Sequence, residues 1–338
     1  MLEAVVKASN NSLANGTWSN YKVVETHLNR CQKMIGRRFE YPFSNDSVLV
    51  FVAYLLDRKN LKSSTIENYL SALRVLHMTE GHLVSNLRPD IIRSLLKGKS
   101  NEDAVLDREK EEKLPVTLEL LALMREILLA DPKMDRAEKS AIWAIACMCF
   151  FGSLRLGEVL SGKVRTIDPR FDMLRRDVMI KSRKVGSRKR RFLELNLKCP
   201  KESGSNSVGI RIEIFDTPDC YCPVAAFEDY EKEFGALDPK NAVFRLRQSG
   251  DAISKARFNR VLKVMLMPHV TYGKITGHSF RSGVSSLMGR AGFPDSDIQC
   301  LGRWSSEAYR KYIKLGRLVR VRNADKISKF VNSQVEAL

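Results

Sequence analysis

The side chains best suited to chemistry gather towards the C-terminal end of the chain. His278 and Arg281 are three residues apart, a spacing that places both on one face of a helix. Trp304 follows with an indole N–H donor, and two phenols, Tyr309 and Tyr312, come after it. An imidazole, a cation, a neutral donor and a phenol nucleophile in this order are suited to binding a phosphodiester and attacking its phosphorus.

A second arginine lies far upstream. Arg155 and Glu158 are three residues apart, so both are expected on one face of a short helix that Ser153 begins. The surrounding residues are strongly apolar, and a charge without a partner would be unfavourable there. We therefore interpret Arg155 as a functional residue and not as an ordinary surface residue.

The composition favours a polyanionic partner. The chain has 338 residues, with 57 Lys and Arg against 39 Asp and Glu, which gives a formal net charge of +18. Such an excess is typical of proteins that bind nucleic acid, although a soluble protein with a merely basic surface would show it too. The length predicts two domains, and a hydrophobic content of 44% is sufficient for a core in each.

The seven cysteines indicate neither disulfides nor a metal site. Their number is odd and their spacing irregular, which argues against a disulfide framework. Cys147 and Cys149 lie in the apolar run 141–151 and are expected to be buried. Cys220 and Cys222 form a close pair, but no second pair completes a four-ligand zinc site. We expect no metal and no cofactor.

The sequence shows no signal for secretion or for a membrane. The N-terminus lacks a positively charged segment followed by an apolar core, so we expect no signal peptide. The longest apolar run, residues 141–151, is too short to cross a bilayer. These features predict a soluble protein that is not secreted. It would act in the nucleus if its host is a eukaryote and in the cytoplasm otherwise.

Residues 1–100 are predicted to form a small helical domain that grips DNA. Apolar residues recur there with helical spacing, and no alternating strand pattern occurs. The expected helices cover residues 17–36, 46–57, 64–81 and 89–96. Ser64 and Glu67 form a capping-box signal at the start of the third helix. Residues 101–114 are polar and charged, which predicts a linker.

Residues 115–338 are predicted to form the second domain, which begins with two helices. Thr117 is expected to cap a helix over residues 117–130. Gly152 is placed to end a second helix over residues 138–151. Later helices are expected from about Pro223, Ser254, Ser279, Asp295 and Ser305.

The middle of the second domain changes to strand periodicity. Residues 192–197 and 210–214 alternate apolar and polar side chains, which predicts an antiparallel hairpin with Lys201 in its loop. Just before them, residues 175–191 hold nine basic residues and one acid. This segment is interpreted as a DNA-phosphate contact or a nuclear import signal, and the alternative is a solvated, mobile loop. The predicted DNA contacts are Arg183, Lys184, Arg188, Lys189, Arg190 and Arg191.

Together these residues resemble the active site of the tyrosine recombinases, the phage integrase-like family. The resemblance is carried by Arg155, a hairpin lysine, the His278-x-x-Arg281 pair, the run 302–304 and a final tyrosine, in this order. The last motifs are most similar to those of mobile-element recombinases, the DIRS-like and crypton-like groups. The resemblance implies a mainly α fold with a small antiparallel β-sheet. It also implies a C-shaped clamp of two domains around DNA, a helical core-binding domain and an α+β catalytic domain.

The resemblance implies roles for the arginines and the tyrosines. Arg155 and Arg281 would clamp the nonbridging oxygens of the phosphate. Tyr312 would attack the phosphorus and leave a 3′-phosphotyrosine. Tyr309, three residues earlier, is the rival nucleophile.

The remaining residues would assist the transfer. Lys201 would protonate the departing 5′-oxygen, and Lys198 is the alternative for this general acid. His278 would orient the phosphate and assist proton transfer, and Trp304 would donate its indole N–H to a phosphate oxygen. Glu158 would lie behind these groups and hold an arginine or His278 in place.

The implied function is site-specific DNA recombination for a mobile element, without a metal ion. The partner would be double-stranded DNA, bound by a homo-tetramer across two synapsed duplexes, and the free protein would be a monomer. One alternative is a domesticated DNA-binding protein that keeps the fold but has lost activity. Another is a topoisomerase-like strand transferase that uses the same chemistry without synapsis.

Overall fold

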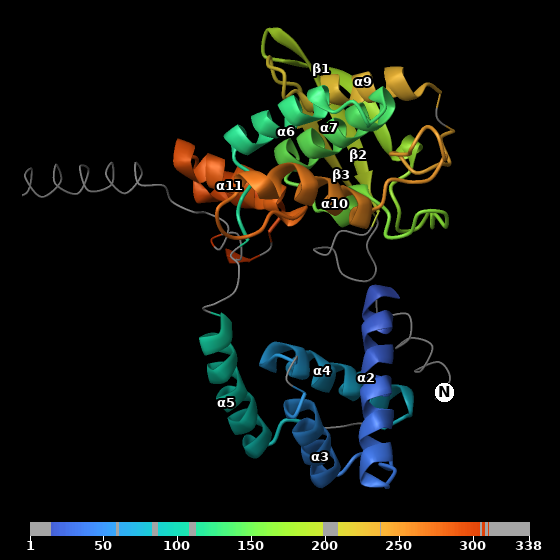
Figure 1. Ribbon diagram of the computed structural model, residues 1–338, viewed down its shortest axis with the longest axis vertical. Helices are drawn as coiled ribbons and strands as arrows, with labels where there is room; N and C mark the ends of the chain where they lie inside the picture. The colour runs from blue at the N-terminus through green and yellow to red at the C-terminus, as the bar shows by residue number, and fades with distance from the viewer. Residues whose placement is uncertain are drawn as a thin grey trace, which may run out of the picture. The chain divides into compact units, whose positions relative to one another are not determined.

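The computed structural model divides the chain into two compact units, Met1–Lys110 and Glu111–Leu338 (Figure 1). It describes residues 15–58, 61–82, 87–107, 113–198, 209–236, 238–304, 306, 307 and 310. The division between the units falls inside the stretch expected to be a linker. Within the described ranges, no helix combines the length and apolar character that a bilayer crossing requires.

All the regular elements described in the N-terminal unit are helices, as the sequence predicted. Its helices are α2 (Asn15–Ile35), α3 (Asn45–Leu56), α4 (Ser63–Thr79) and α5 (Asp90–Asp107) (Figure 1). Their apolar faces meet in one core, where Phe51, Leu55, Ile66 and Leu73 are completely buried. Removing such side chains from water is the main force that holds short helices together.

Helix α5 continues to Asp107, well past the predicted end, so the first part of the expected linker is helical. Its polar residues form contacts within the N-terminal unit. Lys99 and Asp103 form an ion pair of 3.0 Å, and Asp103 accepts a 2.6 Å hydrogen bond from the backbone N–H of Ser63. The N-cap of α4 is Lys62 and not Ser64. The predicted capping box is therefore wrong, because a carboxylate from α5 serves the first turn of α4 instead.

A buried histidine fixes the entry to α3. His77 of α4 is completely buried, and its Nδ1 lies 2.7 Å from the carbonyl oxygen of Leu73. A carbonyl can only accept, so Nδ1 carries the proton. The backbone N–H of Phe43 donates a 3.0 Å bond to Nε2. His77 is therefore held as the neutral imidazole, and burial lowers its pKa below the ordinary value.

We predict that acid weakens the N-terminal unit through this histidine. A group with a lowered folded pKa contributes stability above its unfolded pKa and loses it as the pH falls through the folded pKa. Protonation at Nε2 would also leave the Phe43 N–H without an acceptor, at a cost of about 1–3 kcal/mol. Hydrogen exchange of α3 and α4 amides, followed from pH 8 to pH 5, should show lost protection.

The matched variants are His77→Phe and His269→Gln, the second being an exposed histidine of the other unit. His77→Phe should be less stable at neutral pH but should have a shallower pH dependence. Some dependence will remain, because burial also lowers the pKa of His27 in the same core. An unchanged slope in His77→Phe would contradict this account, and His269→Gln should retain the wild-type slope.

The C-terminal unit combines helices with one small sheet. The helices are α6 (Leu118–Ala130), α7 (Arg136–Phe151), α8 (Leu156–Val159), α9 (Pro223–Phe234), α10 (Lys255–Leu266), α11 (His278–Ala291) and α12 (Asp295–Gly302). Helix α7 is the centre of the core and contacts α6, α8, α9 and α11. Cys147 and Cys149 of α7 are completely buried, which confirms the prediction. Thr117 caps α6 and Gly152 caps the end of α7, also as predicted.

The sheet has three antiparallel strands in the order β1–β2–β3. They are β1 (Val178–Val185), β2 (Arg188–Leu197) and β3 (Ile210–Phe215). The predicted hairpin corresponds to β2 and β3 and is confirmed. The interpretation of residues 175–191 as a mobile loop is wrong, because they form a short 3-10 turn, β1 and the first residues of β2. The sequence did not predict strand β1. Most of this strand is exposed and polar, so it lacks the alternation of apolar and polar residues that indicates a half-buried strand.

Candidate functional site

Arg155 lies in the turn between α7 and α8. Ser153 in this turn has a left-handed backbone, with a φ of 48°, and Arg155 is the N-cap of α8. The Nη1 atom of Arg155 lies 3.0 Å from Oε1 of Glu158, and the Arg155 backbone N–H donates a 2.9 Å bond to Oε2. The Glu158 side chain is 7% exposed and that of Arg155 is 24% exposed. The carboxylate is thus buried, while the guanidinium keeps an edge at the surface.

Arg281 reaches the same turn from α11. Helix α11 starts at His278, which is half-buried, and Arg281 follows one turn later, completely buried. Its Nη1 donates a 2.8 Å bond to the carbonyl oxygen of Ser153, and its Nη2 donates to the carbonyl oxygen of Gly302. Its guanidinium carbon lies 4.4 Å from the ring centroid of Trp304, a cation–π contact. Arg281 therefore joins the α7–α8 turn to the end of α12.

Two glycines allow these segments to approach. A Cβ on Gly277 would lie 1.8 Å from Cδ1 of Leu156, so α8 and the start of α11 touch at a distance that no side chain permits. A Cβ on Gly302 would lie 1.7 Å from the Trp304 ring. These contacts bring Arg155 and His278 into one neighbourhood and let the indole fold back over Arg281.

Arg303, which the sequence analysis did not single out, also enters this cluster. Its Nη2 lies 3.0 Å from Oε2 of Glu158 and 3.4 Å from the carbonyl oxygen of Ser153, and its Nη1 lies 3.2 Å from the carbonyl oxygen of Gly152. The Arg303 side chain is 13% exposed. The argument used for Arg155 would have found it, since Arg303 is a charge set between Leu301, Gly302 and Trp304.

The cluster has an excess of positive charge. Arg155, Arg281 and Arg303 converge on the α7–α8 turn, and Glu158 neutralises one of the three charges. Planar guanidinium groups suit the oxygens of a phosphate, which they bind with two parallel hydrogen bonds. In the part of the chain that the structure describes, no group of three or more His, Cys, Asp or Glu side chains is arranged to hold a metal ion. The arrangement is therefore suited to a phosphoryl group.

Three of the predicted site residues, Lys201, Tyr309 and Tyr312, lie outside the described residues. Lys198, the alternative to Lys201, is described. Its Nζ lies 2.7 Å from Oδ1 of Asp177, which is 5% exposed and also accepts a 2.9 Å bond from the backbone N–H of Leu174. Moving this ammonium group to a DNA phosphate would leave a buried carboxylate without its cation, which is energetically costly. This pairing disfavours Lys198 as the general acid.

The six hairpin residues predicted to contact DNA fall into two groups. Arg183 pairs with Glu213 at 2.7 Å, Arg190 with Asp216 at 2.7 Å, and Arg191 with Glu228. The hydrogen bond from Arg190 holds the pKa of Asp216 below its ordinary value. Lys184, Arg188 and Lys189 are exposed at the tip, where Lys184 lies opposite Lys189 in the register. Within the described ranges, no carboxylate pairs with these three residues.

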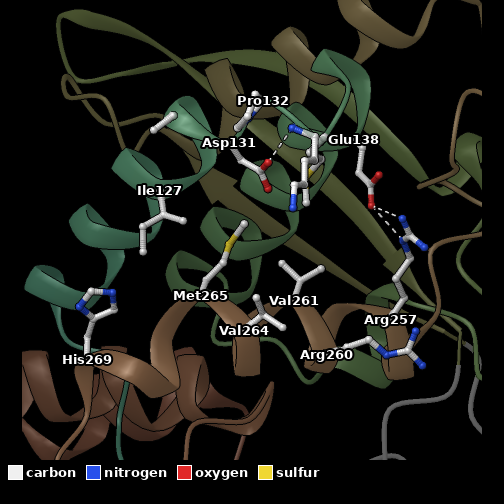
Figure 2. A pocket seen from close by; sticks show the side chains of 13 residues that line it. Ile127, Asp131, Pro132, Glu138, Arg257, Arg260, Val261, Val264, Met265 and His269 are labelled. Carbon is white, nitrogen blue, oxygen red and sulfur yellow. Dashed lines mark hydrogen bonds and ion pairs between the residues drawn. The ribbon is translucent and has the colours of Figure 1, made fainter.

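A separate cavity of about 780 Å³ lies between α6, α7 and α10 (Figure 2). Its wall is mostly apolar and includes Val261, Val264 and Met265. At one side Glu138 and Arg257 point towards each other, with Nε and Nη2 of the arginine 2.9 and 2.6 Å from one carboxylate oxygen (Figure 2). None of the predicted site residues lines this cavity.

No family model and no curated protein sequence matches the chain. Solved structures do match. The integrase of transposon Tn1549, bound to transposon right-end DNA, gives a TM-score of 0.57 at 16% identity over 97% of this chain and 98% of that one. A lambda integrase dimer bound to a core site gives 0.54 at 13% identity over 89% of each chain.

The XerH site-specific recombinase, bound to a palindromic difH substrate, gives a TM-score of 0.55 at 12% identity over 88% of this chain and 75% of that one. The chain has the tyrosine recombinase fold. The predicted fold class, mainly helical with a small antiparallel sheet, is confirmed. Within the tyrosine recombinase fold of this chain, the arginine cluster lies where α7, α8, α11 and α12 meet.

Proposed function

We propose that this protein is a site-specific recombinase that cuts and rejoins double-stranded DNA through a 3′-phosphotyrosine. The observation that carries the proposal is the meeting of two arginines at the α7–α8 turn, where Arg155 pairs with Glu158 and Arg281, from the distant helix α11, binds the Ser153 carbonyl oxygen. Burying Arg281 and Glu158 together has a large desolvation cost, which a purely structural core would avoid with apolar residues. The likeness to integrases in complex with DNA supports the same conclusion.

The arginines stabilise the charge that develops on the phosphate. As the tyrosine oxygen approaches phosphorus, negative charge accumulates on the nonbridging oxygens, and Arg155 and Arg281 bind them. His278, at the start of α11, orients the phosphate and assists proton transfer. Trp304 contributes its indole N–H while its ring packs on Arg281. No metal ion is needed, because side chains supply the cations.

The bond changes balance without a co-reactant. The Tyr312 phenol gives its proton to His278 as its oxygen forms a bond to phosphorus, the bond from phosphorus to the 5′-oxygen breaks, and Lys201 protonates that oxygen. Rejoining is the reverse step with a 5′-hydroxyl from the same strand or from a second duplex. Glu158 holds Arg155 in place through the whole cycle.

The proposed assembly is a clamp. Residues 1–100 and residues 115–338 close around the duplex as a helical core-binding domain and a catalytic domain. Four copies act on two synapsed duplexes, and the free chain is a monomer. The transposon integrase among the structural neighbours favours a mobile-element role. The protein would work where its target DNA lies, in the nucleus of a eukaryote or in the cytoplasm otherwise.

The deciding experiment uses a duplex nicked close to the cleavage point, so that the released fragment diffuses away and the covalent complex accumulates. Denaturing electrophoresis of wild-type protein with such duplexes should show a protein–DNA adduct. Binding without any adduct would favour the inactive DNA-binding protein. Adduct formation with relaxation of supercoils but without joining of two duplexes would favour the topoisomerase-like alternative.

We predict that the hairpin tip, and not its paired arginines, contacts DNA phosphates. Arg188→Ala should weaken DNA binding several-fold and lower the slope of log affinity against log salt by about one, as expected for one lost phosphate contact. Gel-shift titrations at several salt concentrations give both quantities.

Arg191→Ala is the matched control, because Arg191 lies on the same strand but already pairs with Glu228. It should change the salt slope less than Arg188→Ala, since a paired arginine releases fewer counterions. Equal salt slopes for the two variants would show that pairing with a carboxylate does not decide which hairpin residues contact DNA.

A further inference from the structure

Arg303 occupies a backbone conformation that needs a reason. It ends α12 with a φ of 54° and a ψ of 44°, in the left-handed region. Glycine is the usual residue at such a helix end, because a Cβ is unfavourable there. The neighbouring residue Gly302 shows that the chain does use glycine at this turn. An arginine kept in a disfavoured conformation indicates that its side chain is required.

The guanidinium of Arg303 contacts the same groups that hold the two proposed phosphate ligands. Its Nη2 shares Glu158 with Arg155, each arginine taking one carboxylate oxygen through its side chain. The same atom shares the Ser153 carbonyl oxygen with Arg281, at 3.4 and 2.8 Å. Arg303 is therefore bonded to a partner of each arginine and to neither arginine itself.

The segment 302–304 is also fixed from its other side. The Gly302 carbonyl accepts from Arg281, the Trp304 ring packs on the Arg281 guanidinium, and the Trp304 carbonyl accepts a 3.0 Å bond from Gln299. A displacement at residue 303 would consequently disturb the contacts that place Arg281 and Trp304.

We propose that Arg303 is a positioning residue that holds Arg155 and Arg281 in place for the phosphate, acting through Glu158 and the Gly152–Ser153 carbonyls. This role rests on the proposed function. By binding Oε2 while Arg155 binds Oε1, Arg303 fixes the orientation of the buried carboxylate that positions Arg155. By binding the carbonyl oxygens of Gly152 and Ser153, Arg303 also fixes the position of the Ser153 carbonyl to which Arg281 donates.

Only an arginine serves this purpose at position 303. The three acceptors are one carboxylate and two carbonyl oxygens, all within 3.4 Å of two guanidinium nitrogens. A planar fork reaches several acceptors at once, whereas a lysine offers a single ammonium group. A lysine would restore the charge next to Glu158 without holding both carbonyls.

The test compares single-turnover cleavage of the nicked duplex with DNA affinity and melting temperature. Arg303→Met should slow cleavage about 100-fold, because a displacement of about 1 Å at reacting groups costs this much, while affinity changes less than about threefold. Arg303→Gly removes the same guanidinium but relieves the backbone strain, so it should slow cleavage as much while its melting temperature lies above that of Arg303→Met. A merely structural arginine would instead give cleavage rates that follow the melting temperatures.

Further variants test whether Arg303 acts on cleavage through Glu158 and whether a lysine can replace it. Arg303→Lys should cleave at a rate between those of wild type and Arg303→Met. The losses in Arg303→Met and Glu158→Gln should not add in the double variant, since each removes the same contact. Arg257→Met is the control, because it breaks an arginine–glutamate pair with the 8% exposed Glu138 away from the cluster, and it should cleave normally.

The outcomes separate this role from the proposed function. If the wild-type chain forms no adduct, the recombinase proposal fails and the role of Arg303 fails with it. If the wild type forms the adduct and Arg303→Met and Arg303→Gly form it equally fast, only the role of Arg303 is overturned. Additive losses with Glu158→Gln would also overturn it.

Discussion

Tyr312→Phe is expected to abolish the covalent protein–DNA adduct and to leave DNA binding nearly unchanged. The substitution removes one oxygen, and that oxygen is the atom proposed to attack phosphorus. The ring that remains can pack as before, so affinity should change little. No other hydroxyl can replace it, because attack requires an oxygen in line with the leaving 5′-oxygen. Denaturing electrophoresis on the nicked duplex, with gel shifts for affinity, measures both effects.

Tyr309→Phe is the matched variant, since it makes the same chemical change three residues earlier. On a helix this separation corresponds to about 4.5 Å of rise, so both phenols cannot be in line with one phosphate. Tyr309→Phe should retain the adduct. Mapping of the peptide linked to DNA identifies the nucleophile directly. An adduct on Tyr309 would reverse the assignment.

The second large effect is expected at the arginines. Arg155→Ala and Arg281→Ala should each reduce cleavage by about 10³-fold, the loss that follows removal of a preorganised donor to a developing charge. DNA affinity should fall much less, because most binding energy comes from other phosphate contacts. Chelation by EDTA should leave wild-type cleavage unchanged, because these side chains supply the positive charge. Loss of cleavage in EDTA with recovery in magnesium would contradict this mechanism.

The two arginines should differ in stability. Arg281→Ala leaves the buried carbonyl oxygens of Ser153 and Gly302 with one donor fewer, at a cost of about 1–3 kcal/mol for each group left unsatisfied. Arg155→Ala leaves Glu158 paired with Arg303, so its melting temperature should stay closer to that of the wild type. Arg155→Ala is therefore the cleaner test of catalysis. A cleavage rate near that of wild type in this variant would remove Arg155 from the active site.

Local patterns in the sequence predicted most elements correctly. Helical spacing located the helices of both units, and alternation located β2 and β3, because burial of one face imposes those periods. Hydrophobic periodicity failed to predict elements in which burial of one face does not determine the spacing of apolar residues. Strand β1 is exposed over most of its length, and the last turns of α5 are held by the Lys99–Asp103 pair and by a bond to α4. The bond from Ser63 to Asp103 joins residues far apart in the sequence, so no local window contains it.

The sequence by itself determined the pairs that are close along the chain. His278 and Arg281 lie one turn apart on α11, which follows from the helical repeat alone. Arg155 is instead the N-cap of α8, so its contacts with Glu158 are those of a helix start and not of a shared helix face. The order of the motifs also indicated the fold class and the chemistry.

Only the tertiary structure decided which groups meet across the chain. Arg281 binds the Ser153 carbonyl, Arg303 binds Glu158, and the paired arginines of the hairpin are separated from its tip. Each of these contacts joins segments that are far apart in sequence. A hydrogen bond depends on distance and direction within a few tenths of an ångström, and the packing of α7, α8, α11 and α12 sets those distances. No periodicity along the chain encodes them.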